Sequence, residues 1–140
     1  MLTVEGFALD PPPEFKLEEM TVGLRQPLEG GGSQSLIVQS KAARPGSRLD
    51  ELAAETMAEL SQSIGGMKNL ARSEVTFADG GAGVVLSYDW STHGGELRQY
   101  FVMRLEGGRL CTVTLTVPRA QVTPESAGRL MKTIASIRPV

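Results

Sequence analysis

Residues 84–117 have the sequence VVLSYDWSTHGGELRQYFVMRLEGGRLCTVTLTV, and this stretch decides the fold class. It contains three runs in which successive side chains alternate in character, and the glycine pairs 94–95 and 107–108 separate the runs. A period of two predicts β-strands, and glycine pairs between such runs predict tight hairpin turns. We therefore expect an antiparallel meander of three strands.

Each of these predicted strands has an apolar row of side chains. In the first strand the row consists of Val84, Leu86, Tyr88 and Trp90, and in the second of Leu97, Gln99, Phe101, Met103 and Leu105. Gln99 is the one polar member of its row. In the third strand, threonines at 112, 114 and 116 alternate with apolar residues, so both faces of that strand can be partly covered.

Further strands are predicted on the N-terminal side of the meander. A strand runs from Ala71 to Phe77, and residues 19–26 and 35–40 form a hairpin across the glycine-rich loop 27–33. Residues 3–9 are expected to form one short edge strand. No lysine or helix start follows the loop glycines, so the sequence does not predict a phosphate-binding loop there.

Two helices complete the predicted fold. Apolar residues from Leu49 to Ile64 recur at helical spacing, with Ser47 as the expected N-cap and two glycines after the last turn. A second helix begins at Thr123 and Pro124 and continues to Ile137. Helices combined with consecutive antiparallel strands predict a single α+β domain over residues 1–140.

Composition excludes several classes of protein. A chain of 140 residues buries roughly 70% of its unfolded surface, and contents of 41% hydrophobic and 21% charged residues are typical of globular domains. The formal net charge of -2 offers no basic surface for nucleic acid. The single cysteine, Cys111, excludes an internal disulfide, and residues 1–10 lack the pattern of a signal peptide, so we expect a cytoplasmic protein.

The sequence offers little material for catalysis. His93, the only histidine, lies in a predicted hairpin turn, and Cys111 lies on the apolar side of its strand, where burial keeps a thiol protonated. By alternation Asp89 points to the Val85 side of its strand, where we expect it to cap a neighbouring loop or to pair with an arginine, and not to act as an acid or base. A base, a nucleophile and an oxyanion hole cannot be assembled from these residues, so we expect no enzyme, no metal and no cofactor.

Three segments together resemble one known family. They are Val84-Val85-Leu86-Ser87-Tyr88-Asp89-Trp90, Leu97-Arg98-Gln99-Tyr100-Phe101 and Thr112-Val113-Thr114-Leu115-Thr116. In this order they are similar to the DcrB-related family, and within it to the Eag chaperones of type VI secretion systems. The likeness also includes Phe15 with the strand after it, Leu36-Ile37-Val38, the helix ending at Ile64-Gly65-Gly66 and the C-terminal helix, and so covers nearly the whole chain.

The resemblance implies a PsbP-like fold, an antiparallel sheet flanked by helices. It further implies a homodimer that shields the N-terminal transmembrane helices of a secreted effector before export. The residues that match the family's client-binding groove are Met20, Val22, Ile37, Ile64 and Gln99. Thr56 departs from the family, which often has a glutamine there, and its shorter side chain puts a hydrogen bond to the client in doubt. Each of these residues could instead belong to an ordinary core or sheet face.

Two other functions remain open at this point. A stand-alone DcrB-like or PsbP-like module that docks on a folded protein complex would have a polar sheet face and be monomeric. A small-molecule binder or enzyme would place ionisable groups in a cleft between helix and sheet, and the sequence shows no such cluster.

Overall fold

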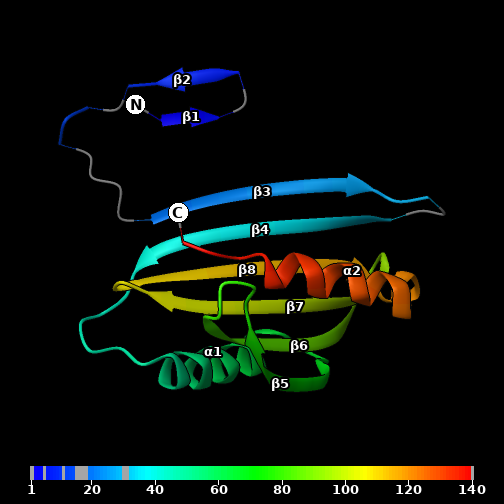
Figure 1. The fold of residues 1–140 in the computed structure, drawn as a ribbon. Helices are drawn as coiled ribbons and strands as arrows, with labels where there is room; N and C mark the ends of the chain where they lie inside the picture. Colours follow the sequence, from blue (N-terminus) through cyan, green and yellow to red (C-terminus); the bar gives the residue numbers. More distant parts are fainter. Residues whose placement is uncertain (1, 5, 11, 15–18, 30–31, 140) are drawn as a thin grey trace.

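The computed structural model describes residues 2–4, 6–10, 12–14, 19–29 and 32–139. Within them the chain forms eight strands and two α-helices (Figure 1). The strands are β1 (Leu2–Val4), β2 (Phe7–Leu9), β3 (Glu19–Pro27), β4 (Ser33–Ala42), β5 (Lys68–Thr76), β6 (Ala82–Thr92), β7 (Gly95–Glu106) and β8 (Arg109–Pro118). The helices are α1 (Leu49–Ser63) and α2 (Pro124–Ala135), with a short 3-10 helix, η1 (Arg119–Gln121), before α2.

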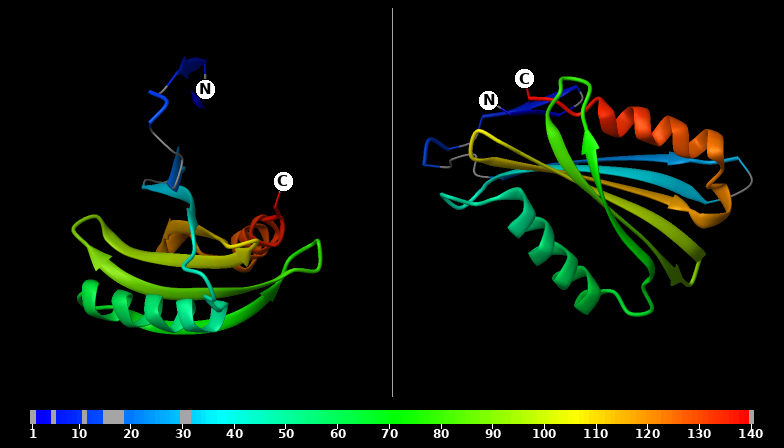
Figure 2. Two further views of the ribbon diagram at one scale, coloured as in Figure 1. Left: turned by 90° about the vertical axis from the view of Figure 1, so that its left-hand side faces the viewer. Right: turned by 60° about the horizontal axis from the view of Figure 1, so that its bottom comes forward.

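The main sheet has six strands in the order β3-β4-β8-β7-β6-β5, and every neighbouring pair is antiparallel. The predicted meander forms its centre as β6, β7 and β8. The two helices lie on opposite faces of this sheet, as Figure 2 shows. The predicted α+β class, an antiparallel sheet flanked by helices, is confirmed.

Each helix covers its own hydrophobic core. On the α2 face the buried residues are Phe77, Val85, Val102, Val113, Leu115 and Ile134. On the α1 face they are Ala53, Val84, Leu86, Met103 and Leu110. Both buried sets come from the helices and from the β5–β8 half of the chain, whereas all nine residues of β3 are exposed. The β3 end of the sheet therefore projects beyond the cores.

The N-terminal segment differs from the prediction of one edge strand over residues 3–9. It forms two strands that pair with each other, with Val4 opposite Phe7 and Leu2 opposite Leu9. The chain reverses at Gly6, whose φ of 79° is a backbone conformation that glycine adopts without steric cost. A pair of three-residue strands is too short for alternation to reveal the turn between them.

The helix starts agree with prediction at one helix and not at the other. Ser47 is not the N-cap of α1: Arg48 holds that position without a side-chain cap, and the Ser47 hydroxyl donates to the Arg44 carbonyl over 2.6 Å. At α2 the predicted cap is confirmed. The Thr123 hydroxyl accepts a hydrogen bond from the Ser126 backbone amide, and the Ser126 hydroxyl accepts one from the Thr123 backbone amide. The serine at 47 closes a turn instead of starting a helix.

Candidate functional site

The β3–β4 end of the sheet exposes large apolar side chains. In β3 the exposed fractions are 42% for Met20, 49% for Val22 and 60% for Leu24, and in β4 Ile37 is 42% exposed. β3 pairs with β4 on one side, and no strand in the described part of the chain pairs with its other side. Three of the residues predicted to bind a client therefore lie at this end.

These apolar residues are divided between the two faces of the sheet. Residues directly opposite each other in paired strands share a face. Val22 lies opposite Val38, which packs on the α2 core, whereas Ile37 lies opposite Gly23 on one side and Thr114 on the other. Met20, Val22 and Leu24 thus belong to the α2 face, and Ile37 belongs to the α1 face.

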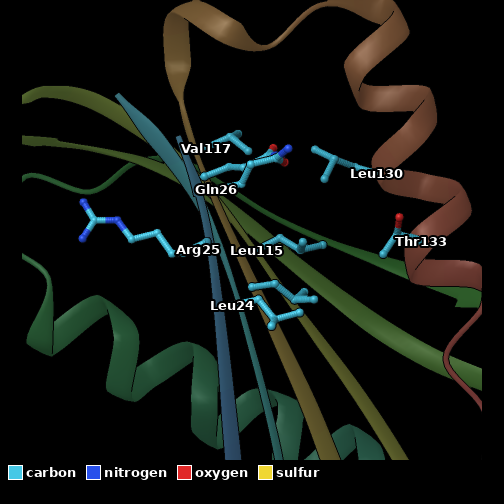
Figure 3. A pocket seen from close by; sticks show the side chains of 10 residues that line it. Leu24, Arg25, Gln26, Leu115, Val117, Leu130 and Thr133 are labelled. Atoms are coloured by element: carbon cyan, nitrogen blue, oxygen red, sulfur yellow. The ribbon is translucent and has the colours of Figure 1, made fainter. Parts of the chain in front are cut away.

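An apolar groove of about 330 Å³ lies on the α2 face, between the edge strands and α2 (Figure 3). Its apolar lining residues are Leu24, Leu36, Leu115, Val117 and Leu130, and polar side chains from β3, β4 and α2 stand around them. The groove continues the exposed side of β3, because Leu24 lines it and Val22 and Met20 follow at every second position. The sequence did not single out this groove, since α2 and β3 are distant in the chain.

Gln99 lies on the α1 face among polar partners from both neighbouring strands. Its side-chain oxygen accepts a hydrogen bond from the Tyr88 hydroxyl, and its amide nitrogen donates to the Thr116 hydroxyl over 3.0 Å. Burial raises the pKa of Tyr88 to about 12, so this hydroxyl stays a donor. A glutamine amide carries two N–H groups, and Thr116 takes one of them. Along its own strand Gln99 has only apolar neighbours on the same face. The polar partners of its side chain, Tyr88 and Thr116, come from the two neighbouring strands.

A wide hollow of about 710 Å³ opens beside Thr116 on the same face. It lies between the β3–β4 end of the sheet and the start of β7, and its lining includes Arg25, Ser35, Leu97, Thr116 and Gln121. The lining is mixed in polarity. Such a hollow can accept hydrogen-bonding groups as well as apolar surface.

Thr56 and Ile64 complete the residues matched by resemblance, and both come from α1. The Thr56 hydroxyl donates to the Leu52 carbonyl over 2.8 Å, within its own helix. Ile64 is the C-cap of α1 and lines a shallow hollow with Met67 and Leu70. Neither shares a described pocket or hydrogen bond with Ile37 or Gln99. Because Met20 and Val22 lie on the α2 face and Ile37 and Gln99 lie on the α1 face, one copy of the chain does not gather all six residues around one cavity.

Asp89 forms an ion-pair network, as its position on the strand predicted. Its side chain is 1% exposed and binds Arg98 through two hydrogen bonds, one of them 2.9 Å long. Asn69 donates to the same carboxylate over 2.8 Å, and Arg119 lies 3.6 Å away. The network connects β5, β6, β7 and η1, which fixes the packing of these elements.

The described residues contain no cluster of metal-ligating side chains, that is, no group of three His, Cys, Asp or Glu side chains that could hold a metal ion. Cys111 packs against the α2 core, and burial raises the pKa of its thiol. Within the described part of the chain, neither helix is long and apolar enough to cross a membrane.

Acid is expected to destabilise the fold through Asp89 and Asp79. The hydrogen bonds from Arg98 and Arg104, respectively, are the main reason why the pKa of each carboxyl lies below its ordinary 3.8. A lowered pKa in the folded state stabilises the protein above the unfolded pKa, and this stabilisation is lost as the pH falls toward the folded pKa. Urea unfolding should therefore show stability declining below about pH 5. Asp89→Asn should flatten this decline; an unchanged pH dependence would contradict the role of Asp89.

Comparisons with known proteins agree with this architecture. The DcrB family profile matches residues 16–136. The crystal structure of PA94 from Pseudomonas aeruginosa, a protein of unknown function, has a TM-score of 0.76 at 18% identity, and the match covers 99% of this chain and 95% of that one. The solution structure of the PsbP protein CyanoP from Synechocystis sp. PCC 6803 has a TM-score of 0.54 at 12% identity, covering 90% and 94%. No curated protein matches the chain. At these identities the structural likeness shows the fold, which is PsbP-like as predicted.

Proposed function

The chain belongs to the DcrB family, and on that premise we propose that it is a cytoplasmic effector chaperone. In this proposal it binds and shields the apolar N-terminal helices of an effector of a type VI secretion system, as the resemblance to Eag chaperones implies. It acts by binding alone, without covalent chemistry or a cofactor.

The observation that carries the proposal is the exposed apolar surface at the β3–β4 end of the sheet. Of the seven large apolar side chains exposed in the described part of the chain, four lie there: Met20, Val22, Leu24 and Ile37. Met20, Val22 and Leu24 form one row on the α2 face, with Ile37 behind them on the α1 face, and exposed apolar side chains that gather at one end of a domain commonly mark a binding site. Covering such side chains contributes about 25 cal/mol per Å² of apolar area.

The polar groups beside this surface support a helical transmembrane client in particular. Membrane helices associate through close packing and through hydrogen bonds between polar side chains. Gln99 keeps one amide N–H beyond its bond to Thr116, and Thr114 lies directly opposite Ile37. These groups can form hydrogen bonds with polar atoms of a client helix that packs on the α1 face.

Substitution of Ile37 by glutamine tests the proposal. Because Ile37 is 42% exposed, Ile37→Gln should leave the Tm nearly unchanged and weaken client binding by roughly tenfold, the equivalent of about 1.4 kcal/mol. Val22→Gln should behave in the same way if the β3 side also contacts the client. Binding is measured by co-purification with a carrier protein fused to the apolar N-terminal helices of the effector encoded by the neighbouring gene.

Val113→Gln is the control, because Val113 is 4% exposed and belongs to the α2 core. A buried amide without a partner costs about 1 to 3 kcal/mol, so this variant should lose several degrees of Tm. If Ile37→Gln instead lowers the Tm strongly while the client still co-purifies, Ile37 is a core residue and the proposed site is wrong.

A second function is favoured by the hydroxyl-rich part of the α1 face, where Thr114, Thr116 and Ser35 lie on paired strands. A module that docks on a folded protein complex would use such a polar face. In that case the apolar fusion would not co-purify with the wild-type protein, whereas a folded partner would.

A further inference from the structure

A second hollow of the α2 face, of about 410 Å³, lies beyond the end of α2. Residues 137–139, which follow α2, run back over β8 and β4 and line it from one side (Figure 1). Its charged lining residues are three arginines and one glutamate: Arg104, Arg109, Arg138 and Glu106. We propose that this arginine hollow binds a small organic carboxylate. The site goes beyond the proposed function, because it shares no lining residue with the groove beside Leu24 or the hollow beside Thr116.

Arg104 is the most buried of the three arginines, with a side chain that is 4% exposed. Nη1 and Nη2 donate to Asp79 over 3.0 and 2.7 Å, and Nη2 also donates to Glu106 over 2.8 Å. Nε is buried and has no hydrogen-bond partner among the described residues. Because a guanidinium is planar, its Nε–H lies parallel to one N–H of Nη2, on the edge that faces Glu106. Arg104 therefore keeps one donor on the side where Glu106 lines the hollow.

Arg138 and Arg109 are exposed and bring further positive charge to the hollow. In the described part of the chain Arg138 makes one hydrogen bond, from Nη1 to the Ser136 carbonyl over 3.0 Å. Its Nε and Nη2 thus present the pair of parallel N–H groups that can hold both oxygens of a carboxylate. Arg109 donates from Nε to the Ser40 hydroxyl over 3.2 Å, which holds its guanidinium against β4. Donors and charge for an anion therefore come from β8 and from the segment after α2.

The charge balance of the hollow favours an anion with a single negative charge. Three arginines against Glu106 and Asp79, the two carboxylates that bind Arg104, leave one positive charge. The whole chain has a formal net charge of -2, so the hollow is opposite in sign to the protein around it. A carboxylate balances the remaining charge, whereas a phosphate with two negative charges would be repelled more strongly by Glu106.

The apolar part of the lining indicates what the carboxylate is attached to. It comes from Cys111 on β8 and from Ile137 and Pro139 after α2. Pockets for small molecules typically measure about 300 to 1,000 Å³ and combine apolar walls with a few polar groups. The volume of about 410 Å³ is at the small end of this range. The ligand is therefore a carboxylate with a short aliphatic chain, which packs against the three apolar residues.

Titration of the isotope-labelled protein with hexanoate tests the site. In two-dimensional NMR spectra the Nε–H signals of Arg104 and Arg138 should shift and saturate, with a Kd of about 1 mM or lower. Hexanol, which has the same chain without the charge, and inorganic phosphate should shift both signals much less. The proposal fails if hexanoate gives no saturable shift up to about 20 mM, or if phosphate binds more tightly than hexanoate.

Two exposed substitutions should change the affinity for hexanoate in opposite directions. Arg138→Gln removes the charged donor pair and should weaken binding by about tenfold or more. Glu106→Gln removes a like charge beside the Nε–H of Arg104 and should strengthen binding. Arg129→Gln is the matched control, because Arg129 is an exposed arginine of α2 outside the hollow, and it should bind as the wild type does. Equal weakening by Arg129→Gln, or weakening by Glu106→Gln, would show general attraction to surface charge and would overturn the site.

Cys111 provides a second measurement, since it is the only cysteine and lines the hollow. Saturating hexanoate should slow the alkylation of its thiol by iodoacetamide, in which the thiolate displaces iodide. The same concentration should have little effect on Arg138→Gln. An alkylation rate that hexanoate leaves unchanged in the wild type would place the bound ion outside the hollow and contradict the proposal. These measurements contain no client, so their failure is distinct from a failure of the Ile37→Gln co-purification.

Discussion

Asp89→Ala is expected to lower the free energy of unfolding by about 3 to 5 kcal/mol, as removal of one partner of a buried ion pair typically does. The carboxylate is 1% exposed and accepts hydrogen bonds from Arg98 and Asn69. Removing it leaves the mostly buried guanidinium of Arg98 without its partner and the Asn69 amide without its acceptor. Urea unfolding followed by circular dichroism measures the loss.

Asp50→Ala is the control for this prediction. Asp50 also pairs with an arginine, Arg72, over 2.9 Å, but its side chain is mostly exposed. Because water screens exposed pairs, this variant should unfold nearly as the wild type does. If the two variants lose similar stability, the Asp89 network does not act as a buried ion pair.

Gly83→Ala is expected to destabilise the fold by about 2 to 3 kcal/mol, near the upper end for overpacking a core. A Cβ on Gly83 would lie 2.5 Å from two carbons of the Phe77 ring and 2.8 Å from the Met103 carbonyl oxygen. The guanidinium of Arg104 packs over the Phe77 ring, with its central carbon 4.6 Å from the ring centroid. The added methyl group would therefore shift the ring and disturb the contact between Phe77 and Arg104.

Gly128→Ala gives the opposite result by the same chemical change. Gly128 lies inside α2, and nothing lies within 4 Å of a Cβ built there. Alanine at a helix interior is about 1 kcal/mol more favourable than glycine. Thermal unfolding should thus show a higher Tm for Gly128→Ala and a lower one for Gly83→Ala. A rise in both would show that the space around Gly83 is larger than described.

The sheet was largely predictable because its strands alternate over long runs with glycine turns between them. The meander, both helices, the Thr123 cap and the position of Asp89 followed from local patterns. The paired strands β1 and β2 did not, since each has three residues. Neither did the first residues of β5, where the register shifts between Lys68 and Ala71 and Asn69 has a φ of 57°.

The candidate site was less predictable than the fold because it depends on which strands become neighbours. Alternation places Met20 with Val22, but only the pairing of β3 with β4 shows that Ile37 faces the other side of the sheet. Likewise, Gln99 stands in an apolar row along β7, and only the neighbouring strands bring Tyr88 and Thr116 to its amide. Contacts across strands have no signature in a single run of sequence.

The irregularity in β5 bears on how far the chain can assemble. Growth into filaments requires two complementary strand edges on each molecule, one at either end of the sheet. At the β5 end the register shift bends the strand, and charged Lys68, Arg72 and Glu74 follow along it. These are features by which natural sheets prevent edge-to-edge growth. The β5 edge is therefore protected against pairing with another sheet, so concentrating the protein should give no fibrils that grow through this edge.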